Sequence, residues 1–367
     1  MSIQPWKWFA KRQAENGSES KQDTPDPNSE DNVPAVPRGL TVRTVEQFDD
    51  MEGLVADMLY QGRYALLLRD QIADNLSVEL LQQARAALND AMSVVPQGEV
   101  LMLHRRDDDK ELEKAGDVER VEALLLDRYA VTNVEYLEFV AGGGYEQMGL
   151  WDPDVWPAVV DFVDQSGHPG PRYWSKGSFP VKLSDHPVVG INWYEASTYA
   201  RWAGKRLPSD AEWVKAAAWP VSVAGSIPMQ RRFPWGDSFD PTRANIWDAA
   251  IHSTVPVQQF PEGVSPGSVF GLIGNVWEWT TTNYGIWDNR RYEMSAPFKS
   301  LRGGAFDTYF EGQADNHFQS GDVPMARKHN IGFRCAVELA ELVPCLHVGG
   351  EDGDVAATES EAAALAG

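Results

Sequence analysis

The chain has 367 residues, with 54 Asp and Glu against 32 Lys and Arg, so its formal net charge is -22 at pH 7. Because proteins grip nucleic acid mainly through clustered Lys and Arg, this excess of carboxylates argues against nucleic acid as a partner. The sequence has no apolar run of about 18 residues and no apolar stretch of roughly 7–15 residues near its start, so we expect neither a membrane-spanning helix nor a secretory signal, and we expect a cytoplasmic protein.

The first 40 residues are expected to form a disordered arm with an aromatic and basic tip. Residues 13–32 contain no Leu, Ile, Val, Met or aromatic side chain, and such a stretch cannot bury enough apolar area to offset its ordering entropy. The tip can act as a tethered docking peptide for a partner protein or for anionic lipid at a membrane surface, or its aromatics can fold back onto the domain. Its docking residues would be Trp6, Trp8, Phe9, Lys11 and Arg12.

Residues 41–93 are predicted to contain a pair of amphipathic helices. Apolar residues recur at spacings of three and four between Val45 and Leu59, and a second helix capped by Asn75 or Ser77 runs toward Pro96. Two helices of this length rarely form a core of their own. We therefore expect them to pack on the following domain or on a second subunit.

Residues 94–337 are predicted to form one domain of short elements joined by irregular chain rich in Trp and Gly. Twelve of the 14 tryptophans lie between Trp151 and Trp287. Strands are expected at 99–103 and 121–126, and helices at 133–140, at 193–203 and from Ser209, where Glu212 stands at capping-box spacing. Residues 338–367 hold seven Asp and Glu and no Lys or Arg, which predicts an acidic disordered tail.

Seven motifs in this region come in the order seen in sulfatase-modifying-factor domains, and the resemblance covers about 94–337. The motifs are YAVTNVEY (129–136), HPVVGINW (186–193), KRLPSDAEW (205–213), FPWGD (233–237), GNVWEW (274–279), RGG (302–304) and GFR (332–334). The chain therefore resembles the formylglycine-generating enzyme family. The resemblance implies a C-type-lectin-like α+β fold with little regular secondary structure, preceded here by the helical pair.

The cofactors of the enzymatic relatives are not expected in this chain. Oxidase members of the family hold copper with two cysteines between the RGG and GFR motifs, whereas residues 305–332 contain none. Soft thiolates select Cu(I), so we expect neither copper nor formylglycine-generating activity. Of the two cysteines, Cys345 falls in the tail and Cys335 is expected to be buried and inert. The related sulfoxide synthases need three histidines in an N-terminal domain, and only His104 precedes residue 150, so we expect no iron.

The resemblance also implies structural calcium sites that are weak in this chain. One site maps to Gly274, Val276 and Glu278, and a second maps to Asn245 and Ile246. The first lacks one side-chain oxygen because Gly271 stands where the family has Asp or Asn, and the second lacks an evident acidic partner. Calcium takes six to eight oxygen ligands, so its affinity should be low. The alternative for Glu278 is a buried carboxylate bonded to backbone amides.

The functional interpretation is a divergent domain that works as a binding or accessory module for a peptide or protein ligand. The groove that holds the substrate in the oxidases would be its binding site, and no catalytic residue is assigned. Two alternatives stay open, an enzyme with divergent chemistry in the same groove and a display protein diversified by a retroelement. The candidate ligand-binding residues are Trp277, Asp307, Tyr309, Asp315, Asn316, His317 and His329.

Overall fold

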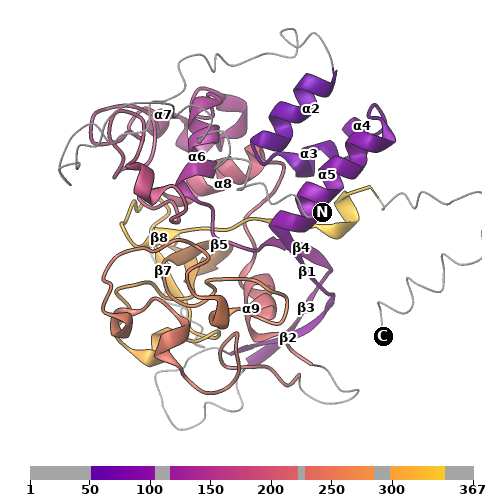
Figure 1. Ribbon diagram of the computed structural model, residues 1–367. Helices are drawn as coiled ribbons and strands as arrows, with labels where there is room; N and C mark the ends of the chain where they lie inside the picture. The colour runs from indigo at the N-terminus through magenta and orange to yellow at the C-terminus, as the bar shows by residue number, and fades with distance from the viewer. Residues whose placement is uncertain (1–50, 104–115, 222–227, 285–297, 344–367) are drawn as a thin grey trace, which may run out of the picture.

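The structure is a computed structural model that describes residues 51–103, 116–221, 228–284 and 298–343 (Figure 1). It begins with four helices, α2 (Met51–Tyr60), α3 (Tyr64–Leu67), α4 (Asp70–Ala73) and α5 (Val78–Ala91). The predicted cap of the last is Ser77, whose hydroxyl accepts a hydrogen bond from the backbone N–H of Leu80 at 3.3 Å. None of the described helices is long and apolar enough to cross a membrane.

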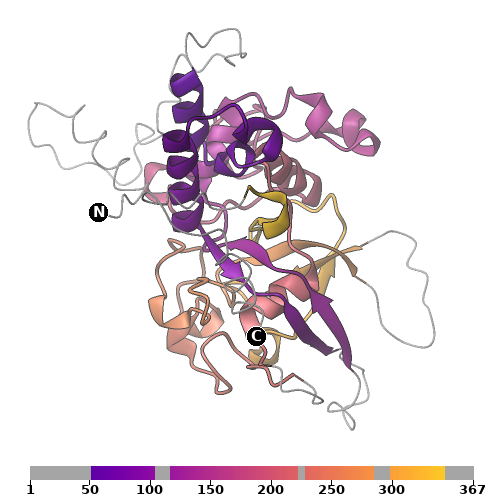
Figure 2. The same ribbon diagram turned by 90° about the vertical axis from the view of Figure 1, so that its right-hand side faces the viewer.

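The helical segment packs on the domain that follows it. Its buried side chains, among them Val55, Leu67 and Leu88, form one apolar cluster with Leu125 and Leu342 of that domain. Figure 2 shows α5 running directly into the strands. The helices therefore share a core with the domain, which is the first of the two arrangements expected from the sequence.

The strands form three small sheets. β1 (Met92–Val95), β4 (Leu124–Asp127) and β9 (Ala336–Glu338) make an antiparallel sheet in the order β1-β4-β9, and β2 (Gly98–Leu103) pairs with β3 (Gly116–Val121). β5 (Trp277–Tyr284), β6 (Phe298–Arg302), β7 (Ser320–Asp322) and β8 (Ile331–Gly332) form the third sheet in the order β7-β6-β5-β8. The strand predicted at 121–126 is in fact two, because the chain leaves one sheet at residue 121 and joins another at 124.

Short helices and 3-10 turns make up most of the remaining regular structure. They are the α-helices α6 (Asn133–Ala141), α7 (Trp156–Val159), α8 (Trp193–Trp202) and α9 (Asp210–Ala218), and the 3-10 turns η3 (Met148–Leu150), η4 (Pro153–Val155), η5 (Val181–Leu183), η6 (Pro241–Arg243), η7 (Trp247–Ala249), η8 (Pro261–Gly263), η9 (Glu311–Gln313) and η10 (Leu339–Glu341). Capping boxes start α6, α8 and α9, and the last is the predicted pair of Ser209 and Glu212. Each box satisfies two backbone groups that a helix start leaves unpaired.

An aromatic core lies between α6 and α8. Tyr136 stacks on Tyr199 with ring centroids 5.4 Å apart, and Phe139 and Phe333 meet the same rings edge to face. Aromatic pairs of this kind stabilise a core by about 0.5–1.5 kcal/mol beyond their buried area. The Trp- and aromatic-rich composition is thus used largely inside the domain.

The structured chain extends past the boundary expected at residue 337. Glu338 still belongs to β9, Leu342 is buried, and the backbone N–H of Val343 donates to the carbonyl of Leu68 at 2.9 Å. In Figure 1 this yellow end of the chain lies beside the indigo helices. Residues 338–343 are therefore part of the folded domain, anchored by Leu342, rather than the start of the tail.

Candidate functional site

Three of the predicted ligand residues lie where β5 and β8 meet the loop after β6. The backbone N–H of Trp277 donates to the carbonyl of Asn330 at 2.9 Å. The side-chain amide of Asn330 donates to both carboxylate oxygens of Asp307, at 3.1 and 3.0 Å. His329 lies with Nε2 3.7 Å from Asp307 Oδ2. One edge of the carboxylate is thus held, while 33% of the Asp307 side chain and 60% of the His329 side chain stay exposed.

Two aromatic rings border these polar groups. The ring of Phe306 lies 5.7 Å from that of His329, and the ring of Tyr173 lies 6.4 Å from it. We call Tyr173, Phe306, Asp307, His329 and Asn330 the Asp307 cluster. The arrangement offers a hydrogen-bond acceptor, an imidazole and the exposed ring of Tyr173 to a ligand, while Phe306 is buried behind the His329 ring.

The sequence pointed to only part of this cluster. Phe306 precedes a predicted residue directly, so its position in the same loop was a usable signal. Tyr173 is more than a hundred positions away in the chain, in a loop with no motif of its own, and nothing in the sequence placed it beside His329.

Asp315, Asn316 and His317 form a separate group. Asp315 pairs with Arg232 at 2.8 Å, and the fully buried Asn316 donates from Nδ2 to the carbonyl of Arg231 at 3.2 Å. His317 is half-buried, and burial lowers its pKa. Asn316 thus holds the loop from the inside, so its side chain does not reach the surface as a ligand residue would.

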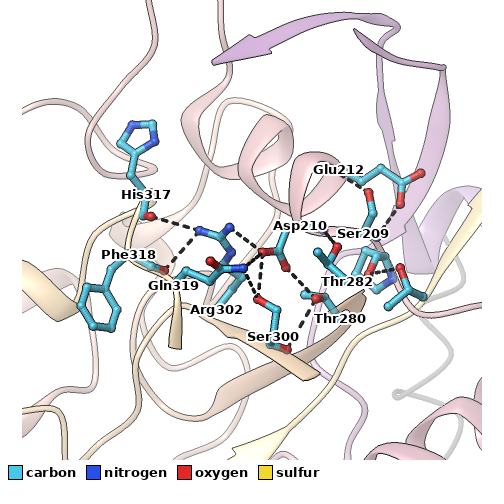
Figure 3. Close-up of polar contacts among 12 residues, drawn as sticks. Ser209, Asp210, Glu212, Thr280, Thr282, Ser300, Arg302, His317, Phe318 and Gln319 are labelled. Carbon is cyan, nitrogen blue, oxygen red and sulfur yellow. Dashed lines mark hydrogen bonds and ion pairs between the residues drawn. The ribbon is translucent and has the colours of Figure 1, made fainter. Parts of the chain in front are cut away.

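A buried network around Asp210 fixes that loop (Figure 3). The carboxylate accepts hydrogen bonds from Arg302 Nη2 at 2.5 Å, Thr280 Oγ1 at 2.6 Å, Gln319 Nε2 at 2.7 Å and Ser300 Oγ at 2.8 Å. Burial alone would raise the pKa of Asp210, but the guanidinium and the hydroxyl donors hold it below its usual range.

The other terminal nitrogen of the Arg302 guanidinium contacts the loop that carries His317 and Phe318. Arg302 Nη1 donates to the carbonyl of His317 at 3.1 Å and to that of Phe318 at 3.3 Å. The ring of Phe318 lies 6.0 Å from Trp277, so the network positions one side of the face that holds the Asp307 cluster. Asp210 and Arg302 both stand inside motifs, but nothing in the sequence indicated that they pair.

Tyr309 is turned away into a third group. Its ring lies 6.0 Å from Trp247 and 5.2 Å from Phe310, and the side chain is exposed. The seven predicted ligand residues therefore divide into three neighbouring groups rather than one site.

The residues proposed for calcium are engaged with one another. Both oxygens of Glu278 accept from Arg334 at 2.7 Å, and Trp213 Nε1 donates to Oε2 at 2.8 Å. Both oxygens of this buried carboxylate already have a cationic partner, so Glu278 is poorly suited to hold a calcium ion as well. Glu278 is indeed buried, but its partners are side chains rather than the backbone amides of the alternative.

The backbone around the two mapped sites is closed by its own hydrogen bonds. The carbonyl of Gly274 accepts from Val276 at 2.9 Å, and that of Asn245, next to Ile246, accepts from Asn275 at 2.7 Å. Asn245 Oδ1 is buried without a partner, which fits one ligand of the second site. Among the described residues no group of three or more His, Cys, Asp or Glu could hold a metal ion.

Of the remaining predicted positions, the structure describes Cys335 but not the docking residues. Cys335 is buried, its backbone N–H donates to Asp127 at 2.8 Å, and burial raises its thiol pKa well above the usual value. A thiol that stays protonated is a poor nucleophile. The docking residues Trp6, Trp8, Phe9, Lys11 and Arg12 lie outside the described residues, as do most of the tail and Cys345.

Comparison with known proteins identifies the family. Residues 77–339 match the sulfatase-modifying factor enzyme 1-like domain. The chain belongs to this family. The family prediction is therefore confirmed, together with its sparse α+β fold and the preceding helices.

The relatives include one named as an enzyme and one named as inactive. The chain is 32% identical over 247 residues to hercynine oxygenase of Mycolicibacterium smegmatis, covering 62% of this chain and 56% of that one. It thus spans about half the length of that oxygenase. It is 28% identical over 294 residues to the inactive C-alpha-formylglycine-generating enzyme 2 of Mus musculus, covering 71% and 90%. Among solved structures, PvdO from Pseudomonas aeruginosa is 22% identical with a TM-score of 0.44, over 68% and 94% of the two chains.

Proposed function

We propose that this family member is a non-oxidase binding or accessory protein that takes a peptide or protein ligand at the Asp307 cluster. The observation that carries the proposal is the content of the segment between the RGG and GFR motifs. Where oxidase relatives have two thiolates, residues 305–332 have no Cys and supply Asp307, His329 and Asn330 instead. A relative named as inactive, which this chain covers over most of its length, supports a role without the oxidase chemistry.

The chemistry of the cluster suits a ligand with a hydrogen-bond donor beside an apolar group. Asn330 fixes the Asp307 carboxylate, so little side-chain entropy remains to be lost when a donor binds. Tyr173, which is 41% exposed, provides aromatic surface next to it, and the buried ring of Phe306 packs beside His329. Aromatic residues that surround one well-placed polar group are typical of binding hot spots.

The binding proposal is tested by selection from a phage-displayed library of random 12-residue peptides on the full chain. Peptides enriched on the wild type should bind Asp307→Asn at least about tenfold more weakly, because hydrogen bonds to charged groups contribute about 1.5–3 kcal/mol. Asp161→Asn, an exposed carboxylate outside the cluster, is the matched control and should bind equally well. Peptides whose affinity is unchanged in Asp307→Asn would overturn the proposal.

A second experiment separates binding from oxidation. The copper-loaded protein is incubated with a cysteine-containing sulfatase-type peptide, and the aldehyde product is sought by mass spectrometry. We expect no product, since the thiolate pair is absent from residues 305–332 and Cys335 is buried. Turnover that is lost in Cys335→Ala would return the protein to the oxidase class.

A further inference from the structure

A second exposed aromatic group lies next to the Asp307 cluster and has no role in the proposed function. It consists of Trp247, Ile251, His252, Tyr309 and Phe310, which we call the Trp247 cluster. Trp247 is 43% exposed, Tyr309 65% and Phe310 63%. Large exposed apolar side chains gathered in one place usually mark an interaction surface.

The cluster is held in shape by its backbone rather than being a chance grouping of loop side chains. The backbone N–H of Trp247 donates to the carbonyl of Thr308 at 3.2 Å, which ties the two contributing loops together. Ala250 and His252 both have φ of 55°, in the left-handed region that L-residues seldom adopt. In that conformation the His252 ring lies 4.3 Å from the ring of Trp247. The strained backbone therefore helps to form the surface.

Carboxylates predominate among the charges on this surface. Residues 247–253 and 309–312 contain the exposed carboxylates of Asp248 and Glu311 and no Lys or Arg. Arg232 approaches Glu311 only at 3.7 Å and is already paired more closely with Asp315. A complementary occupant therefore combines aromatic rings with positive charge.

Such a segment exists in the same chain. We infer that the Trp247 cluster is the docking site for residues 6–12, Trp-Lys-Trp-Phe-Ala-Lys-Arg. This segment has three aromatic and three basic residues and no acidic one. Its rings would stack on Trp247, Tyr309 and Phe310, and its cations would meet the ring faces and the two carboxylates.

The tether allows this contact. Residues 13–50 separate the segment from α2, and 38 residues span up to ~120 Å when extended. A body of about 260 residues has a radius of gyration near 18 Å, which is that of a sphere of radius about 23 Å, so half of its circumference is only about 75 Å. The segment can therefore reach the cluster from α2 in the same molecule.

Limited proteolysis of the full chain tests the assignment. Trypsin cleaves after Lys7, Lys11 and Arg12, and a docked segment is protected at these positions. The rate of their cleavage is measured by intact mass in the wild type and in the triple variant Trp247→Ser, Tyr309→Ser, Phe310→Ser, with a synthetic peptide of residues 1–16 as the unprotected reference.

We expect the triple variant to release the segment about tenfold faster than the wild type, because two lost ring contacts contribute together about 1.4 kcal/mol or more. Trp156→Ser with Val160→Ser removes exposed apolar side chains elsewhere and should leave the rate unchanged. Thermal melting confirms that each variant is folded. Equal rates in wild type and triple variant would overturn the inference, and so would protection that disappears on dilution, since that result assigns the segment to a second copy.

Discussion

Glu138 offers a sharp test of how the helical segment meets the domain. It lies on α6, is only 8% exposed, and shares a hydrogen bond with Tyr60 of α2, close to the carboxylate of Asp57. Burial, more than the neighbouring negative charge, raises the pKa of Glu138 to about 7 from an ordinary value of 4.5. We predict that Glu138→Gln stabilises the protein at alkaline pH and leaves it unchanged at acid pH.

The sign and size follow from proton linkage. Below pH 4.5 both the folded and the unfolded chain hold the Glu138 proton, so the side chain does not favour either state. Between pH 4.5 and 7 the unfolded chain releases that proton while the folded chain keeps it, so the stability falls as the pH rises. The loss reaches about 3 kcal/mol above pH 7 and then stays constant. Glutamine keeps the shape and the hydrogen bond without a charge, so it should recover most of that loss.

The assay is urea unfolding of the wild type and of Glu138→Gln at pH 4.5 and pH 8. The difference in unfolding free energy should be near zero at the lower pH and up to about 3 kcal/mol at the higher, which corresponds to a rise in Tm of about 6 °C or more. Glu146→Gln changes an exposed carboxylate after the same helix and should shift stability by no more than about 0.5 kcal/mol. This prediction would be refuted if Glu138→Gln raised the unfolding free energy equally at both pH values, or lowered it at pH 8. Either result would show that the folded state does not raise the pKa of Glu138.

Three further predictions concern buried charge and metal. Lys205→Met should cost about 3–5 kcal/mol in chemical unfolding, because it leaves the buried carboxylate of Asp127 without its partner at 2.8 Å. Asp210→Asn should cost a similar amount, since Arg302 would lose its buried counter-charge, whereas Arg120→Ala at an exposed pair should stay within about 1 kcal/mol. EDTA should move the Tm by no more than about 2 °C, because the carboxylate of the GNVWEW motif is already paired with a guanidinium, and a fall of many degrees would reveal a structural ion.

The parts of the fold that local chemistry specifies were predictable from the sequence. Two helix starts were predicted from Ser77 and from the pair Ser209 and Glu212, because capping is a contact between residues three positions apart. The break between β3 and β4 was not predictable, because residues 121–126 form one strand-like segment with no Gly or Pro to interrupt it. Only their pairing with different partners, β2 on one side and β1 and β9 on the other, divides them.

The candidate site was predictable only as far as residues adjacent in sequence stay adjacent in space. Asp307 and His329 were both predicted in the segment between two motifs, and their side chains do lie close together. Tyr309 stands two positions from Asp307 but joins Trp247, and Asn316 turns fully inward, because an irregular loop has no periodicity that fixes which way each side chain points. Composition therefore indicates that such a segment is polar and aromatic, but not how its members are shared between surfaces.

The contacts around Lys205 indicate that the helical segment and the domain form one folding unit. Lys205 Nζ donates to the hydroxyl of Tyr64 in α3 at 2.7 Å and to Asp127 at the end of β4 at 2.8 Å. Next to it, Gly204 has φ of 75°, and a Cβ there would lie 2.5 Å from the side chain of Leu66. Lys205 needs the preceding helices in place, because Tyr64 supplies one of its hydrogen-bond partners. A buried ammonium without partners would lower the free energy of unfolding. The family match begins only at residue 77, yet the side chains that complete its core come from residues before it.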